Sequence, residues 1–116
     1  MDMLEWIKNR MWQRKRRKFE LDMLDFIELY LQDYVDRCPG LILRRLKNMG
    51  NHHVFSINAR IDGGQLILFQ AHYKNGEFYF ANCTEDKRLP GWRKELLQYD
   101  IEKLEKAYLR NWEKYI

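Results

Sequence analysis

The sequence has few residues that bend, cross-link or interrupt a chain. It contains two prolines, two cysteines and six glycines in 116 residues. This scarcity excludes a flexible linker, and Cys38 and Cys83 have no motif spacing, so we expect reduced thiols and a cytoplasmic location. No apolar run approaches the roughly 20 residues of a membrane span. Acids at Asp2 and Glu5 argue against a signal peptide.

Motifs of catalysis and of cofactor binding are also missing. The chain has no nucleophile elbow, no phosphate-binding loop and no carboxylate pair at a telling position. Turn formation explains Asp62, and cross-strand pairing explains Lys74 and Glu77. The adjacent His52-His53 lacks the ligand spacing of structural zinc sites. We therefore predict a protein that is not an enzyme and that has no cofactor and no metal.

Composition predicts one folded domain. Apolar residues make up 46% of the chain and aromatic residues 15%, which is typical of a folded protein. We predict a single α+β domain over residues 1–116. It consists of a long N-terminal helix in 1–37, a three- to four-stranded antiparallel meander in 41–84 and a C-terminal helix in 92–116.

Two turns within residues 54–83 predict the meander. Asp62-Gly63-Gly64 and Asn75-Gly76 contain residues that accept positive φ, which two-residue type I′ turns require. The turns divide this stretch into three strands, the last ending at Cys83. Residues 41–47 fit a fourth strand, which we prefer, or a short helix that ends at Gly50.

Side-chain alternation assigns these strands two faces. The first face holds Phe55, Ile57, Ala59, Ile61, Leu66, Leu68, Gln70, His72, Tyr79, Ala81 and Cys83. The second holds Val54, Ser56, Asn58, Arg60, Ile67, Phe69, Ala71, Tyr73, Phe78, Phe80 and Asn82. Because both faces are largely apolar, we expect both to be covered. Each helix covers one face, or both helices cover the first and a partner meets the second.

Two residue groups on these faces have competing interpretations. The aromatic set of the second face is either core, which we prefer, or a sheet-face interface that stacks bases or meets a partner. That set is Phe69, Tyr73, Phe78 and Phe80. On the first face we expect His72 to be a hydrogen-bonded core histidine.

Helical periodicity marks both ends of the chain. Apolar residues recur at helical spacing from Phe19 to Tyr34, and the chain must leave the helix before Pro39. A shorter stripe, at Leu4, Ile7 and Met11, precedes it, and the basic stretch between the stripes leaves open whether the helix is continuous. The second helix has a stripe at Leu97, Ile101, Leu104, Tyr108 and Trp112.

Charges along the first helix are segregated. Residues 8–18 contain seven basic residues and no acid, and residues 20–36 contain six acids and no base. This order opposes the helix macrodipole, so helix formation does not explain it. A partner would explain it. One candidate is a second copy packed antiparallel, which lays base against acid.

The order of elements and the string GNHHVFSINARIDG resemble the double-stranded-RNA-binding domain. The resemblance places Gly50 and His53 in a loop before a strand, and Arg93 and Lys94 at the start of the last helix. The chain departs from that family in having three strands after the loop and in lacking an alanine-rich final helix. We therefore do not assign it to the family.

These observations favour a small non-enzymatic binding protein that acts through protein–protein contact, with a protein partner or a second copy. By analogy of size and architecture, we expect an inhibitor or adaptor of the phage- or mobile-element type. The alternative is a nucleic-acid-binding module that contacts a polyanion through charge. The residues predicted for polyanion or partner contact are Arg10, Arg14, Lys15, Arg16, Arg17, Lys18, Arg44 and Arg45. Contact with a membrane surface is not favoured.

Overall fold

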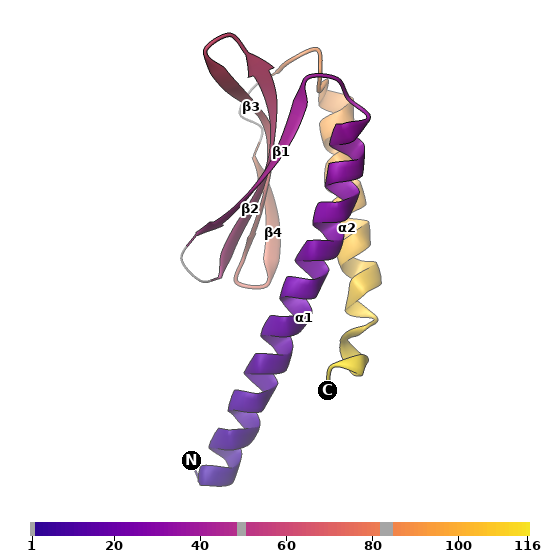
Figure 1. The fold of residues 1–116 in the computed structure, drawn as a ribbon. Coiled ribbons are helices and arrows are strands. Elements are labelled where there is room, and N and C mark those ends of the chain that lie inside the picture. The colour runs from indigo at the N-terminus through magenta and orange to yellow at the C-terminus, as the bar shows by residue number, and fades with distance from the viewer. Residues whose placement is uncertain (1, 49–50, 82–84) are drawn as a thin grey trace.

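Two layers make up the fold, a sheet on one side and two helices on the other (Figure 1). The structure is a computed structural model that describes residues 2–48, 51–81 and 85–116. The elements are α1 (Met3–Asp36), β1 (Leu41–Asn48), β2 (His52–Ile61), β3 (Gly64–Lys74), β4 (Glu77–Ala81) and α2 (Gly91–Leu109), with a final 3₁₀ turn (Trp112–Lys114). This order confirms the predicted α+β fold. Gly50 and Cys83 lie outside the described residues.

The sheet is an antiparallel meander with strand order β1-β2-β3-β4. Residues 41–47 are part of strand β1, as preferred. The turn after β3 has positive φ at both Asn75 (53°) and Gly76 (80°), as a type I′ turn requires. The turn after β2 differs, because Gly63 has a φ of 84° whereas Asn75 is the single non-glycine residue with positive φ in the described ranges. The prediction of a type I′ turn at Asp62 was therefore wrong.

An extra residue in β3 changes which side chains share a face. Ile57 and Asn58 are consecutive in β2, but they pair with Phe69 and Ile67, so Leu68 is a bulge residue without a partner in β2. A bulge breaks the strict alternation of side chains along a strand. The predicted grouping of the faces was therefore wrong. One face joins Phe55, Ile57 and Ala59 to Phe69, Ala71, Tyr73, Phe78 and Phe80.

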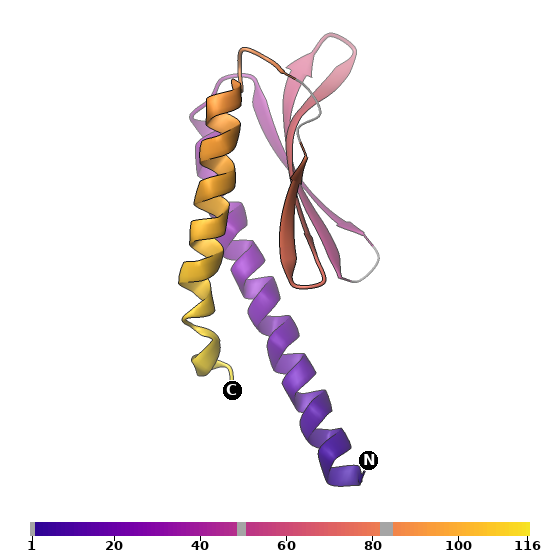
Figure 2. The ribbon, with the colours of Figure 1, turned by 180° about the vertical axis from the view of Figure 1, so that it is seen from behind.

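Both helices pack on this single apolar face (Figures 1 and 2). From α1, the core receives Met23, Leu24, Ile27, Leu31 and Val35, and from α2 it receives Leu97 and Ile101. Leu68 and Phe69 are completely buried beneath them. The alternative in which each helix covers a different face is therefore wrong, and the second face of the sheet is not covered by a helix.

Helix α1 is continuous across the basic stretch. Its first turn is capped by the Asp2 carboxylate, which accepts a hydrogen bond from the backbone N–H of Glu5 at 2.8 Å. Helix α2 ends at Leu109, before the predicted residue 116, and the chain continues as the 3₁₀ turn. Among the described residues, neither helix has an apolar stretch long enough to cross a membrane.

Candidate interaction surface

The first half of α1 extends past the ends of the strands into solvent (Figures 1 and 2). We call residues 3–18 the arm. Every arm residue is exposed except Arg16, which is half-buried. The arm is part of α1 and therefore has a defined helical conformation, but it has little of its own protein to pack against.

The apolar side of the arm faces away from the protein core. Ile7 and the fully buried Ile27 are separated by 20 positions, which rotates one about 200° from the other at about 100° per residue. Leu4, Ile7 and Met11 are accordingly 61%, 40% and 51% exposed. The arm thus presents an apolar stripe that nothing in the described chain covers.

The cations of the arm fall into two groups. Arg16 and Lys18 lie at 3.5 Å from Glu20 and Asp22 respectively, one helical turn further along. The second group has no carboxylate partner among the described residues, and it consists of Lys8, Arg10, Arg14, Lys15 and Arg17. In this group the Arg10 guanidinium lies over the ring of Trp6, at 5.2 Å from its centroid.

The two predicted contact residues outside the arm point to opposite faces of the sheet. Arg45 opposes Phe55 and lies on the covered face, where Nη1 donates hydrogen bonds to Asp25 and Glu28. Its side chain is 7% exposed, so it cannot contact an external polyanion, and its predicted role was wrong. Arg44 opposes Ser56 and is exposed.

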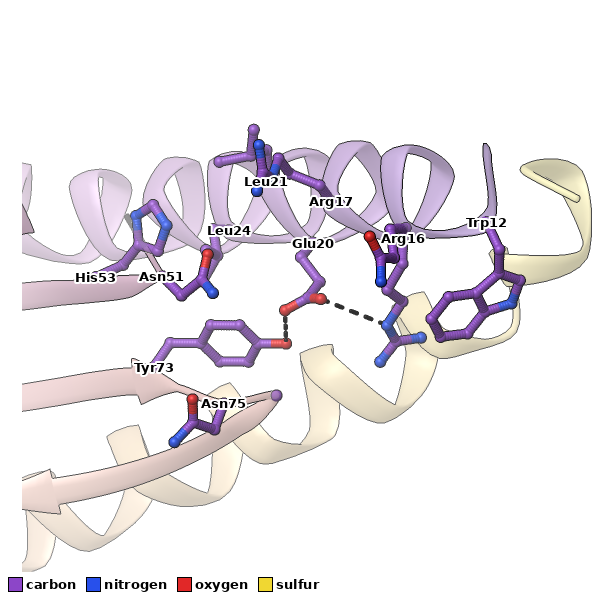
Figure 3. A pocket seen from close by; sticks show the side chains of 12 residues that line it. Trp12, Arg16, Arg17, Glu20, Leu21, Leu24, Asn51, His53, Tyr73 and Asn75 are labelled. Atoms are coloured by element: carbon purple, nitrogen blue, oxygen red, sulfur yellow. Dashed lines mark hydrogen bonds and ion pairs between the residues drawn. The ribbon is translucent and has the colours of Figure 1, made fainter. Parts of the chain in front are cut away.

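A cleft of about 700 Å³ lies where α1 separates from the sheet (Figure 3). Trp12, Arg16 and Arg17 line it from α1, and Tyr73 and Asn75 line it from the β3–β4 hairpin. The Tyr73 hydroxyl donates a 2.7 Å hydrogen bond to Glu20, which also faces Arg16.

Three polar side chains of this cleft, those of Arg16, Glu20 and Tyr73, are engaged with one another. Burial, with the hydrogen bond to Glu20 as the second cause, raises the pKa of Tyr73. A neutral phenol bonded to a paired carboxylate supplies neither a nucleophile nor a base near neutral pH. The Arg16 guanidinium is further fixed over the rings of Phe19 and Trp112, at 5.0 and 5.2 Å from their centroids. Glu20 and two aromatic rings thus hold Arg16 in the wall of the cleft, and His53 lines the cleft with a buried Nδ1 that has no hydrogen-bond partner among the described residues.

The uncovered face of the sheet carries a polar network that the sequence interpretation missed. The Ser56 hydroxyl donates to Asn58 Oδ1 at 2.6 Å, and Asn58 Nδ2 donates to Gln65 Oε1 at 2.9 Å. Ser56 and Asn58 are 2% and 5% exposed, so neighbouring side chains bury them without a helix. The sequence did contain a signal for this network, since β2 carries the polar residues Ser56 and Asn58 on this face.

Histidines extend this network along the same face. His52 Nε2 and His72 Nδ1 are 3.1 Å apart, and His72 Nε2 lies 3.2 Å from Gln70 Oε1. The Tyr79 ring stacks on His72 at a centroid distance of 5.1 Å. Burial, followed by the charge of His52, lowers the pKa of His72. The prediction of a core position for His72 was wrong, because the bulge at Leu68 turns it to the uncovered face.

The predicted aromatic interface lies beneath the helices. Phe69 and Tyr73 are 0% and 3% exposed, and Phe78 and Phe80 are half-buried against the same core. All four lie on the face that the helices cover, as the preferred core interpretation requires. They are therefore not available as a platform for bases or partners.

Neither the comparisons nor the donor groups identify a known class of site. Among the described residues, no three His, Cys, Asp or Glu side chains lie close enough to hold a metal ion. Lys94, which the RNA-binding resemblance places at a helix start, is 3% exposed and thus inaccessible to a phosphate. No protein family, curated protein or solved structure matches the chain.

Proposed function

We propose that this chain is a small binding protein, not an enzyme, that acts through protein–protein contact made by the arm. An inhibitor or adaptor of the phage- or mobile-element type is the kind of protein that fits this size and architecture. The observation that carries the proposal is the uncovered apolar stripe of Leu4, Ile7 and Met11.

An apolar stripe on a preformed helix is suited to a protein groove. Amphipathic helices bind by laying residues at positions i, i+3 and i+7 into such grooves, and Leu4, Ile7 and Met11 have this spacing. Trp6 and Trp12 flank the stripe and are 52% and 53% exposed. Tryptophan is among the residues that contribute most to protein interfaces.

Capture from the native host tests the proposal with a matched pair of variants. Ile7→Asp places a charge in the stripe, and Leu96→Asp places the same charge at an exposed site on α2. We expect wild type and Leu96→Asp to capture a protein partner, and an untagged copy of the chain counts as one. This capture should survive treatment with nuclease. After purification, the captured protein should bind the Ile7→Asp variant at least about tenfold more weakly than it binds wild type. Equal binding by both variants would contradict the proposal.

The second candidate function is nucleic-acid binding, and the unpaired cations of the arm favour it. Arg14, Lys15 and Arg17 have no carboxylate partner in the described ranges and lie within one helical turn. Phosphate contacts of this kind give affinity that falls steeply with salt. Changing all three to Gln should abolish such binding to a labelled oligonucleotide. Unchanged affinity would exclude this function for the arm.

A further inference from the structure

We propose that the partner of the arm is a second copy of this chain, packed with the two α1 helices antiparallel. The inference rests on the proposed function, because it takes the arm as a protein-contact surface and identifies its occupant. It is carried by one face of α1 that runs from the arm to the acidic half of the helix.

This face has the spacing of a helix-packing seam. Residues that alternate by four and three positions fall on one side of a helix, as the contact positions of coiled coils do. From Met11 onwards they are exposed except for the half-buried Asp22, and they are Met11, Lys15, Lys18, Asp22, Asp25 and Leu29. Leu29 is 72% exposed, the largest exposed fraction of an apolar side chain on α1 after Met3.

Neighbouring elements reach this seam at its two acids, where the Tyr115 hydroxyl donates to Asp22 at 2.7 Å and Arg45 Nη1 donates to Asp25. Both carboxylates remain partly exposed, at 34% and 62% of their side-chain surface. Helix α2 contacts α1 through Phe26 and Tyr30, which pair with Tyr108 and Asp100. On the other flank the sheet contacts α1 through Arg45. The other four seam residues lie between these contacts, on the side opposite Ile27.

An antiparallel copy makes this seam complementary to itself. With the two-fold axis near residue 20, Met11 faces Leu29 of the other copy, Lys15 faces Asp25, and Lys18 faces Asp22. Each contact occurs twice. Shifting the register by one heptad brings Lys18 against Lys15 or Asp22 against Asp25, which are like charges. Charge therefore selects this register.

The same arrangement accounts for the order of charges along α1. In this register an antiparallel neighbour lays its basic residues 8–18 beside residues 22–32, which contain the acids Asp22, Asp25 and Glu28 and no base. Lys18 and Asp22 already lie 3.5 Å apart within one copy, so the two copies form an alternating cluster of four charges on the axis. The segregation that opposes the macrodipole in one chain becomes favourable in the pair.

Light scattering with charge reversal tests the complementarity. We expect wild type to approach twice its mass of 14.4 kDa as concentration rises. Lys15→Glu should weaken dimerisation at least about tenfold, whereas Arg17→Glu, the same change on the cleft side of the arm, should weaken it about twofold or less. Equal effects of the two variants would overturn the inference.

Cysteine cross-linking tests the register with Cys38 and Cys83 changed to Ser. Met11→Cys with Leu29→Cys should give a covalent dimer on oxidation, and Met11→Cys alone should not. A dimer from Met11→Cys alone would indicate parallel helices. If the double variant Leu4→Cys with Met11→Cys formed the covalent dimer instead, the two arms would pair only with each other. Either result would contradict the proposed register.

The dimer and the protein-contact function of the arm can fail separately in these experiments. A strictly monomeric wild type at high concentration would overturn the dimer. If Ile7→Asp then still removed binding to another protein, the arm would remain a protein-contact surface. If Ile7→Asp then affected no other protein partner either, both proposals would fail.

Discussion

At the scale of single residues, Arg45 joins the two layers at a considerable desolvation cost. Nη1 bonds to Asp25 and Glu28, but Nε and Nη2 are buried without a hydrogen-bond partner. The guanidinium also lies 5.5 Å from the centroid of the Phe55 ring. Buried charges of this kind stabilise a fold weakly, because desolvation offsets the attraction.

Two substitutions of Arg45 distinguish the contribution of its packing to stability from the contribution of its charge. Arg45→Ala removes both and should lower the free energy of unfolding by about 2–3 kcal/mol. Arg45→Met keeps an apolar stem, and Asp25 is 62% exposed and can regain water, so this variant should lose about 1 kcal/mol or less. Urea denaturation of both variants measures the difference. Equal losses would show that the ion pairs dominate.

The His72 network makes stability depend on pH. Gln70 Oε1 can only accept, so His72 Nε2 donates to it and Nδ1 accepts from His52. Protonation of His72 at Nδ1 breaks this arrangement, which agrees with a pKa below that of the unfolded chain. Burial also lowers the pKa of His53. The unfolded chain therefore binds more protons below about pH 6.5.

We expect the free energy of unfolding to fall as the pH decreases from about 7.5 to about 6, where the unfolded histidines take up protons before the folded ones. His72→Gln cannot titrate and should reduce this slope. Urea titrations at several pH values measure it. A slope that is unchanged in His72→Gln would show that His72 does not contribute.

At the scale of elements, the final 3₁₀ turn holds α1 at the point where the arm leaves the core. Trp112 meets the rings of Phe19 and Trp12 edge-on, at 5.3 and 5.9 Å between centroids. Its ring also faces Arg16. We infer that this turn fixes the C-terminal end of the arm against the rest of the fold.

Trp112→Ala should therefore cost about 2–4 kcal/mol of stability and speed amide exchange in residues 12–19. Trp92→Ala is the matched control, because Trp92 is 54% exposed at the start of α2 and should cost about 0.5 kcal/mol or less. Denaturation and hydrogen exchange measure the two effects. Equal exchange in both variants would contradict a role for Trp112 in fixing the arm.

Element types and order could be predicted from the sequence, but the faces of the sheet could not. Periodicity over Phe19 to Tyr34 and two glycine-containing turns are local signals, and they located α1 and the β3–β4 hairpin. The bulge at Leu68 is not a local signal, since Leu66, Ile67 and Phe69 beside it are apolar and fit either face. One unpaired residue exchanged the faces of β3 and β4 relative to β2. It also produced the wrong expectation of two apolar faces.

The candidate site was predictable only in part. Charge segregation in α1 is visible in the sequence, and so are the arm cations and the stripe of Leu4, Ile7 and Met11. The burial of Arg45 was not, because strand register decides which of the adjacent Arg44 and Arg45 turns to the helices. The network of His52 and His72 also depends on contacts between strands, and alternation alone assigned His72 to the wrong face.

At the scale of the whole molecule, the arm makes the protein elongated. Its principal extents are 59 × 27 × 19 Å, and its radius of gyration is 16.8 Å. A compact chain of this length has a radius of about 13 Å. The excess agrees with a helix that continues well beyond the layers it packs on, and much of the molecular length is therefore available for contact.

The two edges of the sheet limit how copies of this molecule can associate. An edge strand presents unpaired backbone groups to which a further strand can add, and proteins discourage this with short strands and charged side chains. Edge strand β4 has five residues, and edge strand β1 carries Arg44, Arg45 and Lys47 within its eight. Growth of the sheet from copy to copy is thus discouraged at both edges. The antiparallel pairing that we propose for α1 is, by contrast, finite and closes on itself.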